Sequence, residues 1–178
     1  LLPARSSPGR SGWTDDRRSR RGHNWIMRVA TWNVNSLKAR LEAVEKWLDR
    51  AAPDVFLMQE TKLADDDFPH LLLQAAGYEV AHHGEGRWNG VAIASRVGIS
   101  EVVTNFGDGP VRDSRGRSQA EEDFDPFDEA RMLSATCAGI RFVSLYAPNG
   151  RVVGSPFFEG KLRWLARVHD WLAEELTP

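Results

Sequence analysis

The sequence contains a single cysteine, Cys137, in 178 residues, so no disulfide can form within the chain. Disulfides are typical of oxidising compartments, and their absence favours a cytoplasmic protein. No stretch approaches the roughly 18 consecutive apolar residues that a membrane helix requires. The first residues also lack the apolar core of a secretion signal. We therefore expect a soluble protein that makes no contact with a membrane.

The sequence also lacks the spacings of zinc sites. Its five histidines form neither an HExxH pattern nor a Cys/His cluster. His82 and His83 are neighbours in an expected strand, where consecutive side chains point to opposite faces. A metal site built on histidine is therefore disfavoured. Internal repeats and low-complexity tracts are absent after residue 27.

Bulky apolar residues are plentiful, with seven Trp and eight Phe in a chain that is 42% hydrophobic. This content suits one compact domain, which we expect over residues 27–178. Residues 1–26 carry six arginines and two aspartates, a net +4, so the remainder carries −6 of the overall −2. We interpret residues 1–26 as a disordered basic tail upstream of Met27. The alternative is an arm that binds nucleic acid through its arginines.

From Met27 the pattern alternates between strands and helices. A β-prone run over residues 28–33 ends at Asn33, and Ser36 is placed to cap a helix with Leu37, Leu41, Val44 and Leu48 on one face. Residues 55–58 form an apolar run that ends at Gln59 and Glu60. This is a βαβ unit, whose two strands are parallel if they share a sheet. Asn33 and Glu60 would then emerge at the same edge.

The later elements are shorter. We expect a polar loop over residues 63–67, a short helix through 71–75, and strands over 78–81, 91–95 and 99–103. Residues 107–131 are interpreted as a long exposed loop, which includes the acidic residues Glu121, Glu122 and Asp123. Residues 133–138 and 140–146 suit a hairpin. A final helix over 156–176 has an apolar stripe composed of Phe158, Leu162, Leu165, Val168 and Leu172.

Glu60 is the first candidate for chemistry, because it ends a wholly apolar strand at the edge where open α/β sheets bind ligands. Asn33 ends the neighbouring strand, and a carboxylate beside an amide suits a hard cation. Mg²⁺ takes one or two protein carboxylates and keeps water and substrate phosphate as its other ligands. The alternative is that Glu60 is an ordinary surface residue at a strand end.

Two loops are further candidates. Tyr146 ends a strand and is followed by Asn149 and Arg151 on a Pro/Gly turn, a set that could bind a phosphate through hydrogen bonds and charge. Arg87 and Trp88 lie in a glycine-rich loop that could contact a nucleic-acid backbone. The Trp88 loop is equally compatible with a hairpin turn whose Trp packs on the core. For the Tyr146 segment taken alone, a packed Tyr and an ordinary turn are favoured.

Five segments together resemble the exodeoxyribonuclease III family of abasic-site endonucleases, within the endonuclease/exonuclease/phosphatase superfamily. They occur in order at family-like spacing from Met27 to the end of the chain. These segments are residues 31–40 (TWNVNSLKAR), 53–62 (PDVFLMQETK), 89–96 (NGVAIASR), 129–131 (EAR) and 146–150 (YAPNG).

The resemblance implies an α/β fold with a mixed sheet, a four-layer α/β sandwich of the DNase I-like type. It implies that Glu60 binds Mg²⁺, with Mn²⁺ as the alternative, and that Asn33 lies beside it. Tyr146 would contact the scissile phosphate. The implied DNA contacts are Asn149, Arg151, Trp88, Arg87 and Lys62. The implied reaction is hydrolysis of a phosphodiester in double-stranded DNA, at an abasic site or from a 3′ end, by a monomer.

The sequence departs from the family pattern in one respect. The family continues past the last helix to a Gly-Asp-x-Asn motif and a Ser-Asp-His motif, and neither occurs in these 178 residues. We expect the chain to be the amino-terminal portion of a longer enzyme, about half of the sandwich, and inactive alone. Two other functions remain open: a phosphoesterase acting on a lipid or inositol phosphate, and a noncatalytic module that binds DNA.

Overall fold

The computed structural model describes residues 26–108 and 125–175. The predicted tail lies outside these residues except for Ile26, as do the acidic residues 121–123. The helices and strands are β1 (Val29–Asn33), α1 (Leu37–Ala51), β2 (Val55–Gln59), η2 (Asp65–Asp67), α2 (His70–Ala75), β3 (Glu79–His83), β4 (Val91–Ser95), β5 (Ser100–Thr104), β6 (Met132–Cys137), β7 (Ile140–Leu145) and α3 (Pro156–Glu175).

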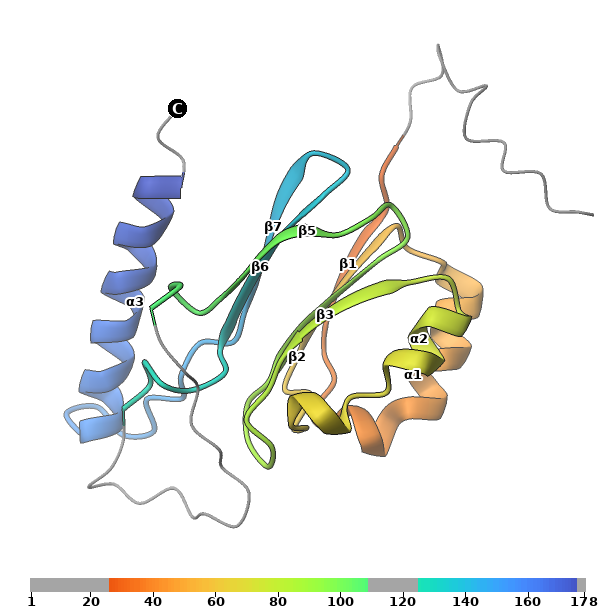
Figure 1. The fold of residues 1–178 in the computed structure, drawn as a ribbon. Coiled ribbons are helices and arrows are strands. Elements are labelled where there is room, and N and C mark those ends of the chain that lie inside the picture. The colour runs from red at the N-terminus through yellow and green to blue at the C-terminus, as the bar shows by residue number, and fades with distance from the viewer. Residues whose placement is uncertain (1–25, 109–124, 176–178) are drawn as a thin grey trace, which may run out of the picture.

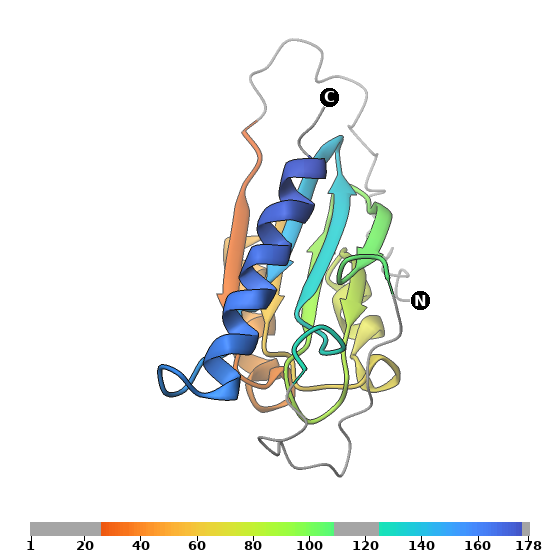
Figure 2. The same cartoon turned by 90° about the vertical axis from the view of Figure 1, so that its left-hand side faces the viewer.

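The described elements form four layers, as the resemblance implies (Figure 1). A sheet with strand order β1-β2-β4-β3 lies against a sheet with order β5-β6-β7. Helices α1 and α2 cover the outer face of the first sheet, and α3 runs along the outer face of the second (Figures 1 and 2). The predicted α/β sandwich is therefore confirmed.

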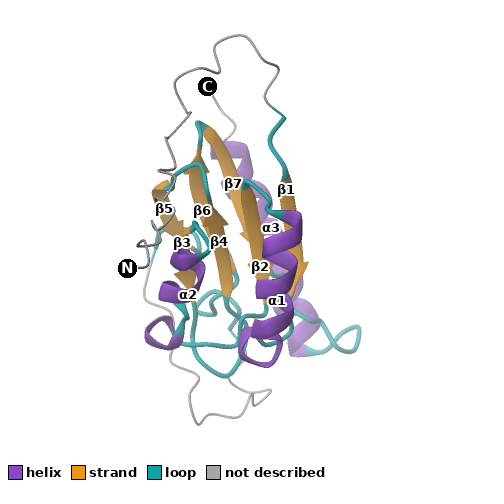
Figure 3. Cartoon of the chain, turned by 90° about the vertical axis from the view of Figure 1, so that its right-hand side faces the viewer, coloured by secondary structure: helices purple, strands orange, loops and turns teal. Residues whose placement is uncertain are grey.

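The βαβ unit is also confirmed, because β1 and β2 pair in parallel from Val29 opposite Val55 to Asn33 opposite Gln59. Helix α1 connects them (Figure 3). Its first turn is capped by Ser36, whose side chain accepts a hydrogen bond from the Ala39 amide. It ends at Ala52 in a left-handed conformation, just before Pro53. β4 then pairs antiparallel with both β2 and β3.

Alternating side chains of the central strands supply two cores. Val55 and Leu57 of β2 face the second sheet, where they pack with Leu133 and Ala135 of β6. The intervening Phe56 and Met58 face the other way, against α1 and α2. β2 is therefore buried on both faces, which explains its continuous apolar run.

The final helix buries Val168 and partly buries Leu172 of the predicted stripe, but other members of the stripe are exposed. Leu162 and Leu165 are 45% and 40% exposed, whereas Phe157, Gly160 and Trp164 are buried with Val168. The predicted stripe is wrong for these two leucines because apolar residues surround the helix at its start. Trp164 packs on Met132 of β6, and its ring lies 6.3 Å from that of Phe106. The larger aromatic surface is buried in preference to the leucines.

Two smaller differences concern loops. The predicted polar loop over residues 63–67 contains the short 3-10 helix η2. Strand β6 begins at Met132, one residue before the predicted start of the hairpin.

On β1, Val29, Thr31 and Asn33 share the face that looks toward the second sheet, yet all three are exposed. The described part of the second sheet therefore covers β2 and β4 but not β1. Within the described residues, no helix is both long and apolar enough to cross a membrane.

The core assignment predicts unequal effects of one substitution at two leucines. Leu48→Ala removes a side chain that is 1% exposed between α1 and the first sheet. We expect it to lower the free energy of unfolding by about 2–5 kcal/mol. Leu71→Ala, at a residue 82% exposed, should change it by less than about 0.5 kcal/mol. Urea denaturation followed by circular dichroism measures both, and equal losses would contradict the burial of Leu48.

Candidate active site

The carboxyl ends of the two parallel strands bring an amide and a carboxylate into contact. Asn33 ends β1, and Glu60 directly follows β2. The Asn33 Nδ2 atom donates a hydrogen bond of 2.7 Å to Oε1 of Glu60. The Asn33 Oδ1 atom accepts a hydrogen bond of 3.1 Å from the amide of Asn35, which fixes the orientation of the side chain. The predicted meeting of these two residues at one edge of the sheet is confirmed.

The other carboxylate oxygen of Glu60 faces a cation. Lys62 Nζ lies 3.1 Å from Glu60 Oε2 and donates a hydrogen bond of 2.6 Å to Asn35 Oδ1. Burial raises the pKa of Glu60, but hydrogen bonds from Asn33, Lys62 and Tyr146 outweigh it and lower the pKa below its ordinary value. Glu60 is therefore ionised at neutral pH and acts as an acceptor.

Tyr146 follows β7 on the second sheet and directs its hydroxyl group to Glu60. Burial raises the pKa of Tyr146, and the negative charge of Glu60 raises it further, to about 12, despite the opposing charge of Arg131. The phenol is therefore protonated at neutral pH and available as a hydrogen-bond donor.

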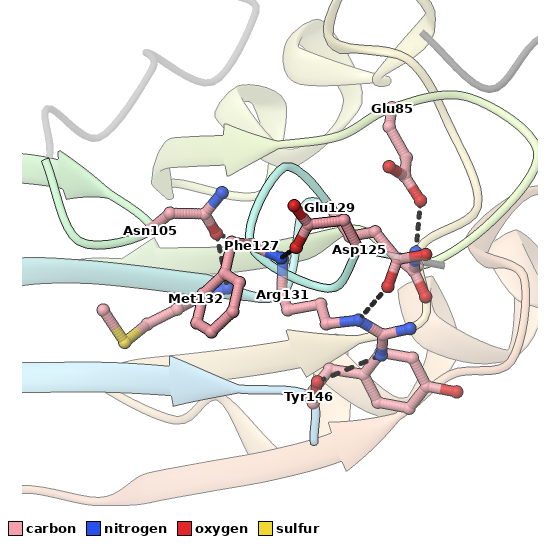
Figure 4. A network of polar contacts seen from close by, with 9 residues as sticks. Glu85, Asn105, Asp125, Phe127, Glu129, Arg131, Met132 and Tyr146 are labelled. Atoms are coloured by element: carbon pink, nitrogen blue, oxygen red, sulfur yellow. Dashed lines mark hydrogen bonds and ion pairs between the residues drawn. The ribbon is translucent and has the colours of Figure 1, made fainter. Parts of the chain in front are cut away.

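Arg131 connects Tyr146 to a buried carboxylate (Figure 4). Its Nε atom donates a hydrogen bond to Glu129, and both side chains are almost fully buried. Its Nη1 atom donates a hydrogen bond of 3.3 Å to the Tyr146 carbonyl oxygen, and the guanidinium carbon lies 5.1 Å from the centre of the Tyr146 ring. The negative charge of Glu129 offsets the free-energy cost of burying the positive charge of Arg131. This pairing allows the guanidinium group to lie beside the Tyr146 phenol inside the protein.

The loop between β7 and α3 supplies the third side of the site. Asn149 accepts a hydrogen bond of 2.9 Å from the backbone amide of Arg151 through its side-chain oxygen. The guanidinium carbon of Arg151 lies 3.5 Å from the centre of the Phe157 ring at the start of α3. The aromatic ring orients this cation, although Arg151 itself is exposed.

These groups surround a cavity of about 220 Å³. Three cationic side chains and one carboxylate face it, which favours an anionic ligand. The lining residues are Glu60, Lys62, Trp88, Asn89, Arg131, Tyr146, Asn149, Arg151 and Phe157.

Comparison with known proteins assigns the fold and the motifs to a family. Residues 30–175 match the endonuclease/exonuclease/phosphatase family. The chain belongs to this family. A stretch of 70 residues is 37% identical to exodeoxyribonuclease III of Haemophilus influenzae, covering 39% of this chain and 26% of that protein. Over 141 residues the chain is 30% identical to recombination repair protein 1 of Drosophila melanogaster, covering 78% of this chain and 18% of that protein.

Solved members of the family have the same fold. An AP endonuclease from Archaeoglobus fulgidus matches with a TM-score of 0.71 and 34% identity, covering 85% of this chain and 53% of that one. A 3′ phosphatase from Neisseria, solved with a product DNA hairpin, matches with a TM-score of 0.70 and 32% identity, covering 85% and 53%. The chain thus spans about half the length of these solved relatives and about a quarter or less of the curated ones. These relatives confirm the resemblance to the exodeoxyribonuclease III family.

The structure brings most of the predicted site residues of this family member together. Glu60, Lys62, Trp88, Tyr146, Asn149 and Arg151 line the cavity. Asn33 touches Glu60 from outside the lining. Arg87 is exposed and does not line the cavity, and its guanidinium carbon lies 5.1 Å from the centre of the Trp88 ring. The roles of these residues in binding DNA and metal are predictions from the sequence.

Sequence reasoning missed three lining residues: Asn89, Arg131 and Phe157. Two of them lie in the motifs that carry the family resemblance, Asn89 in residues 89–96 and Arg131 in 129–131. Their motifs were therefore a usable signal. Phe157 had no comparable signal, because it is one of several apolar residues at the start of a helix.

A hard divalent cation fits the donor atoms at Glu60. No group of three or more Asp, Glu, His or Cys side chains is positioned for a metal within residues 26–108 and 125–175. A carboxylate with an adjacent amide nevertheless suits Mg²⁺, which takes few protein ligands when a phosphate supplies others. Glu60 and Asn33 would hold the ion, and the cationic cavity beside them would accommodate the phosphate.

The raised pKa of Tyr146 predicts late ionisation of this phenol. Because its folded-state pKa exceeds the unfolded value of about 10, its contribution to stability is complete below about pH 10. That contribution is lost as the pH rises through about 12. The absorbance difference at 295 nm between wild type and Tyr146→Phe should therefore show no ionisation below about pH 11. Circular dichroism confirms that both proteins stay folded, and a midpoint near pH 10 would contradict the burial of Tyr146.

Proposed function

We propose that this chain is part of a Mg²⁺-dependent DNA-repair nuclease that hydrolyses phosphodiester bonds of double-stranded DNA. Hydrolysis would occur at abasic sites or stepwise from 3′ ends, and it would be an activity of the whole protein. One observation supports this function most: Glu60, hydrogen-bonded to Asn33, adjoins a cavity faced by three cationic side chains and the protonated Tyr146. Membership of a family of nucleases and phosphatases supports the reaction class.

Some side chains that line the cavity would compensate the charge of a bound phosphate, and others would donate hydrogen bonds to it. Lys62, Arg131 and Arg151 offset the negative charge of a bound phosphodiester. The single O–H of Tyr146 donates to Glu60 in this structure and would donate to a phosphate oxygen instead when substrate binds. Asn149 faces the same cavity and offers a neutral amide donor. The four-layer scaffold holds these groups in place before the substrate arrives, which favours stabilisation of charge that develops during hydrolysis.

Mg²⁺, when bound at Glu60 and Asn33, would stabilise negative charge on the phosphoryl oxygens and the leaving group. Glu60 is suited to this position because it is ionised at neutral pH. Mn²⁺ has similar ligand preferences and is the alternative ion.

DNA is the favoured substrate among phosphoesters. The relatives include an AP endonuclease and a 3′ phosphatase solved with a product DNA hairpin. An abasic sugar leaves the base stack at little energetic cost, which makes an abasic site accessible to a cavity of this size. Lipid or inositol phosphates are the competing substrate class, and a panel of both kinds assayed with the whole protein distinguishes them.

The metal assignment predicts a large effect at Glu60. In the whole protein, Glu60→Gln should lower kcat on an abasic-site duplex by about 100-fold or more, because loss of a metal ligand costs several kcal/mol. Glu42→Gln is the matched control, since Glu42 is 81% exposed on α1 and pairs only with Lys46 among the described contacts. It should change kcat less than about twofold. Equal rates for the two variants would rule out the assignment of Glu60.

Residues 1–178 alone should bind an abasic-site duplex but leave it uncut in Mg²⁺. Glu60 is the only carboxylate among the described residues that line the cavity, so none remains there to activate water. Fluorescence anisotropy measures binding, and a denaturing gel measures cleavage. Cleavage by residues 1–178 at enzyme-like rates would contradict the proposal that hydrolysis requires the rest of the protein.

The same binding assay tests the cationic cavity. Arg151→Gln should raise Kd and reduce the slope of log K against log salt concentration by about one, as expected for one lost phosphate contact. Arg50→Gln, in the last turn of α1, is the control and should leave the slope unchanged. If both variants behave alike, DNA does not bind at this cavity.

A further inference from the structure

A buried histidine lies behind the Glu60 loop and outside the cavity. The His82 side chain on β3 is 1% exposed. Its Nδ1 atom lies 2.8 Å from Asp65 Oδ1, and its Nε2 atom lies 2.8 Å from Thr61 Oγ1. The Phe68 ring stacks on the imidazole with 4.2 Å between ring centres. A buried histidine that is hydrogen-bonded to the residue next to Glu60 and lies beside a carboxylate is not explained by the proposed DNA contacts.

The protons of this cluster can be assigned from its charges. Burial raises the pKa of Asp65, but contacts with His82 and the Gly84 amide outweigh it and lower the pKa, so Asp65 is an ionised acceptor. Burial lowers the pKa of His82 despite the opposing effect of Asp65, so the imidazole is neutral at pH 7. The proton of the neutral ring therefore belongs on Nδ1, which lies 2.8 Å from Asp65 Oδ1 without hydrogen-bond alignment, and the bare Nε2 accepts the hydroxyl hydrogen of Thr61.

The amide, the carbonyl and the hydroxyl group of Thr61 all form hydrogen bonds. Its amide donates a hydrogen bond of 3.1 Å to the Gly90 carbonyl oxygen, and its own carbonyl accepts one of 3.0 Å from the amide of Leu37. Its hydroxyl packs so closely on Gly90 that a Cβ there would lie 2.1 Å from Oγ1. Gly90 also has a φ of +88°, which only glycine adopts easily. Thr61 is thus tied to the start of α1, the turn before β4 and the end of β3.

The two residues on either side of Thr61 are the ones that meet in the site. Glu60 and Lys62 both adopt left-handed backbone conformations, with φ of 54° and 53°. Such conformations are unfavourable for these residues and persist only when the surroundings impose them. The side chains they present lie 3.1 Å apart at the cavity. A fixed Thr61 between them determines where both charges point.

We propose that Thr61, His82 and Asp65 form a positioning triad that sets the placement of Glu60 and Lys62 for phosphodiester hydrolysis. None of the three touches substrate in this proposal, which rests on the function proposed above. The triad acts through the backbone of residues 60–62, by committing the Thr61 hydroxyl to His82 and so preventing the loop from relaxing.

The proton assignment is tested first in wild-type residues 1–178, where no variant can misfold. Nitrogen-15 NMR of the imidazole at pH 7 should show His82 as the Nδ1–H tautomer with an unprotonated Nε2. An Nε2–H tautomer, or a doubly protonated ring, would overturn the triad.

The positioning role is tested with Thr61→Val and Thr61→Ser in the same chain. Valine keeps the shape but removes the hydroxyl, so hydrogen exchange of the Lys62 amide, which donates to the Asn89 carbonyl oxygen, should accelerate by about tenfold or more. Serine should restore slow exchange. Thr136→Val is the matched control, because it removes a threonine hydrogen bond to Glu101 on the far strands β5 and β6. Equal exchange in all four proteins would overturn the proposal.

The whole protein supplies the kinetic test. Thr61→Val should lower kcat on an abasic-site duplex by about 10- to 100-fold, as for loss of a partner that orients a ligand, with KM changed less than about twofold. Thr61→Ser should recover most of kcat, and Thr136→Val should match wild type. A rise in KM alone, or no rescue by serine, would assign Thr61 another role. If the wild type cuts no DNA, the proposed function fails, whereas the tautomer and exchange results still decide whether the triad positions the loop.

Discussion

The parallel pairing of β1 with β2 is the constraint on which the site depends. Parallel strands end at the same edge, so the polar residues that follow their apolar runs are forced together. Among the described strands this is the one parallel pair, and at its end Asn33 donates to Glu60 across 2.7 Å. The backbone then reinforces the side chains, because the amides of Ser36 and Leu37 donate to the carbonyls of Glu60 and Thr61. The start of α1 is thereby fixed to the same loop that presents the carboxylate, so helix and site form one unit.

Most of the architecture follows from hydrophobic periodicity in the sequence. The continuous apolar run of β2 predicted a strand buried on both faces, and Phe56 and Leu57 do pack into different cores. Periodicity failed for α3, where apolar residues occur on more than one face and the choice lies with the partner surface. Met132 and Phe106 supply that surface and select Trp164 instead of Leu165. No property of the helix sequence alone encodes this selection, because it depends on which residues of a distant strand stand opposite.

The site residues likewise fall into those that a local sequence pattern predicts and those that depend on tertiary contacts. Residues that end strands or occupy turns, such as Glu60 and Tyr146, could be chosen from their local pattern, since the pattern itself places polar groups at a sheet edge. Arg131 lies in a family motif, but its strand position alone does not mark it as a site residue, because its contribution requires the second sheet to bring β6 and β7 over the end of β2 and requires Glu129 to accompany it into the interior. His82 is similar: alternation in β3 gives its face, but only the close approach of two loops, made possible at Gly84, gives it Asp65 and Thr61 as partners. Close tertiary approaches of this kind have no local signature.

One contact reinforces the pairing of an ionised acceptor with a protonated donor in the site. The hydrogen bond from Tyr146 to Glu60 lowers the pKa of the carboxyl group and raises that of the phenol. Each group thereby widens the pH range over which the other keeps its protonation state, the carboxylate ionised and the phenol protonated. The chain carries a net charge of −2, yet the cavity between these two groups is faced by more cations than carboxylates. The affinity of the site for an anion is therefore set by which charges the two sheets bring together, and the net charge of the chain has little bearing on it.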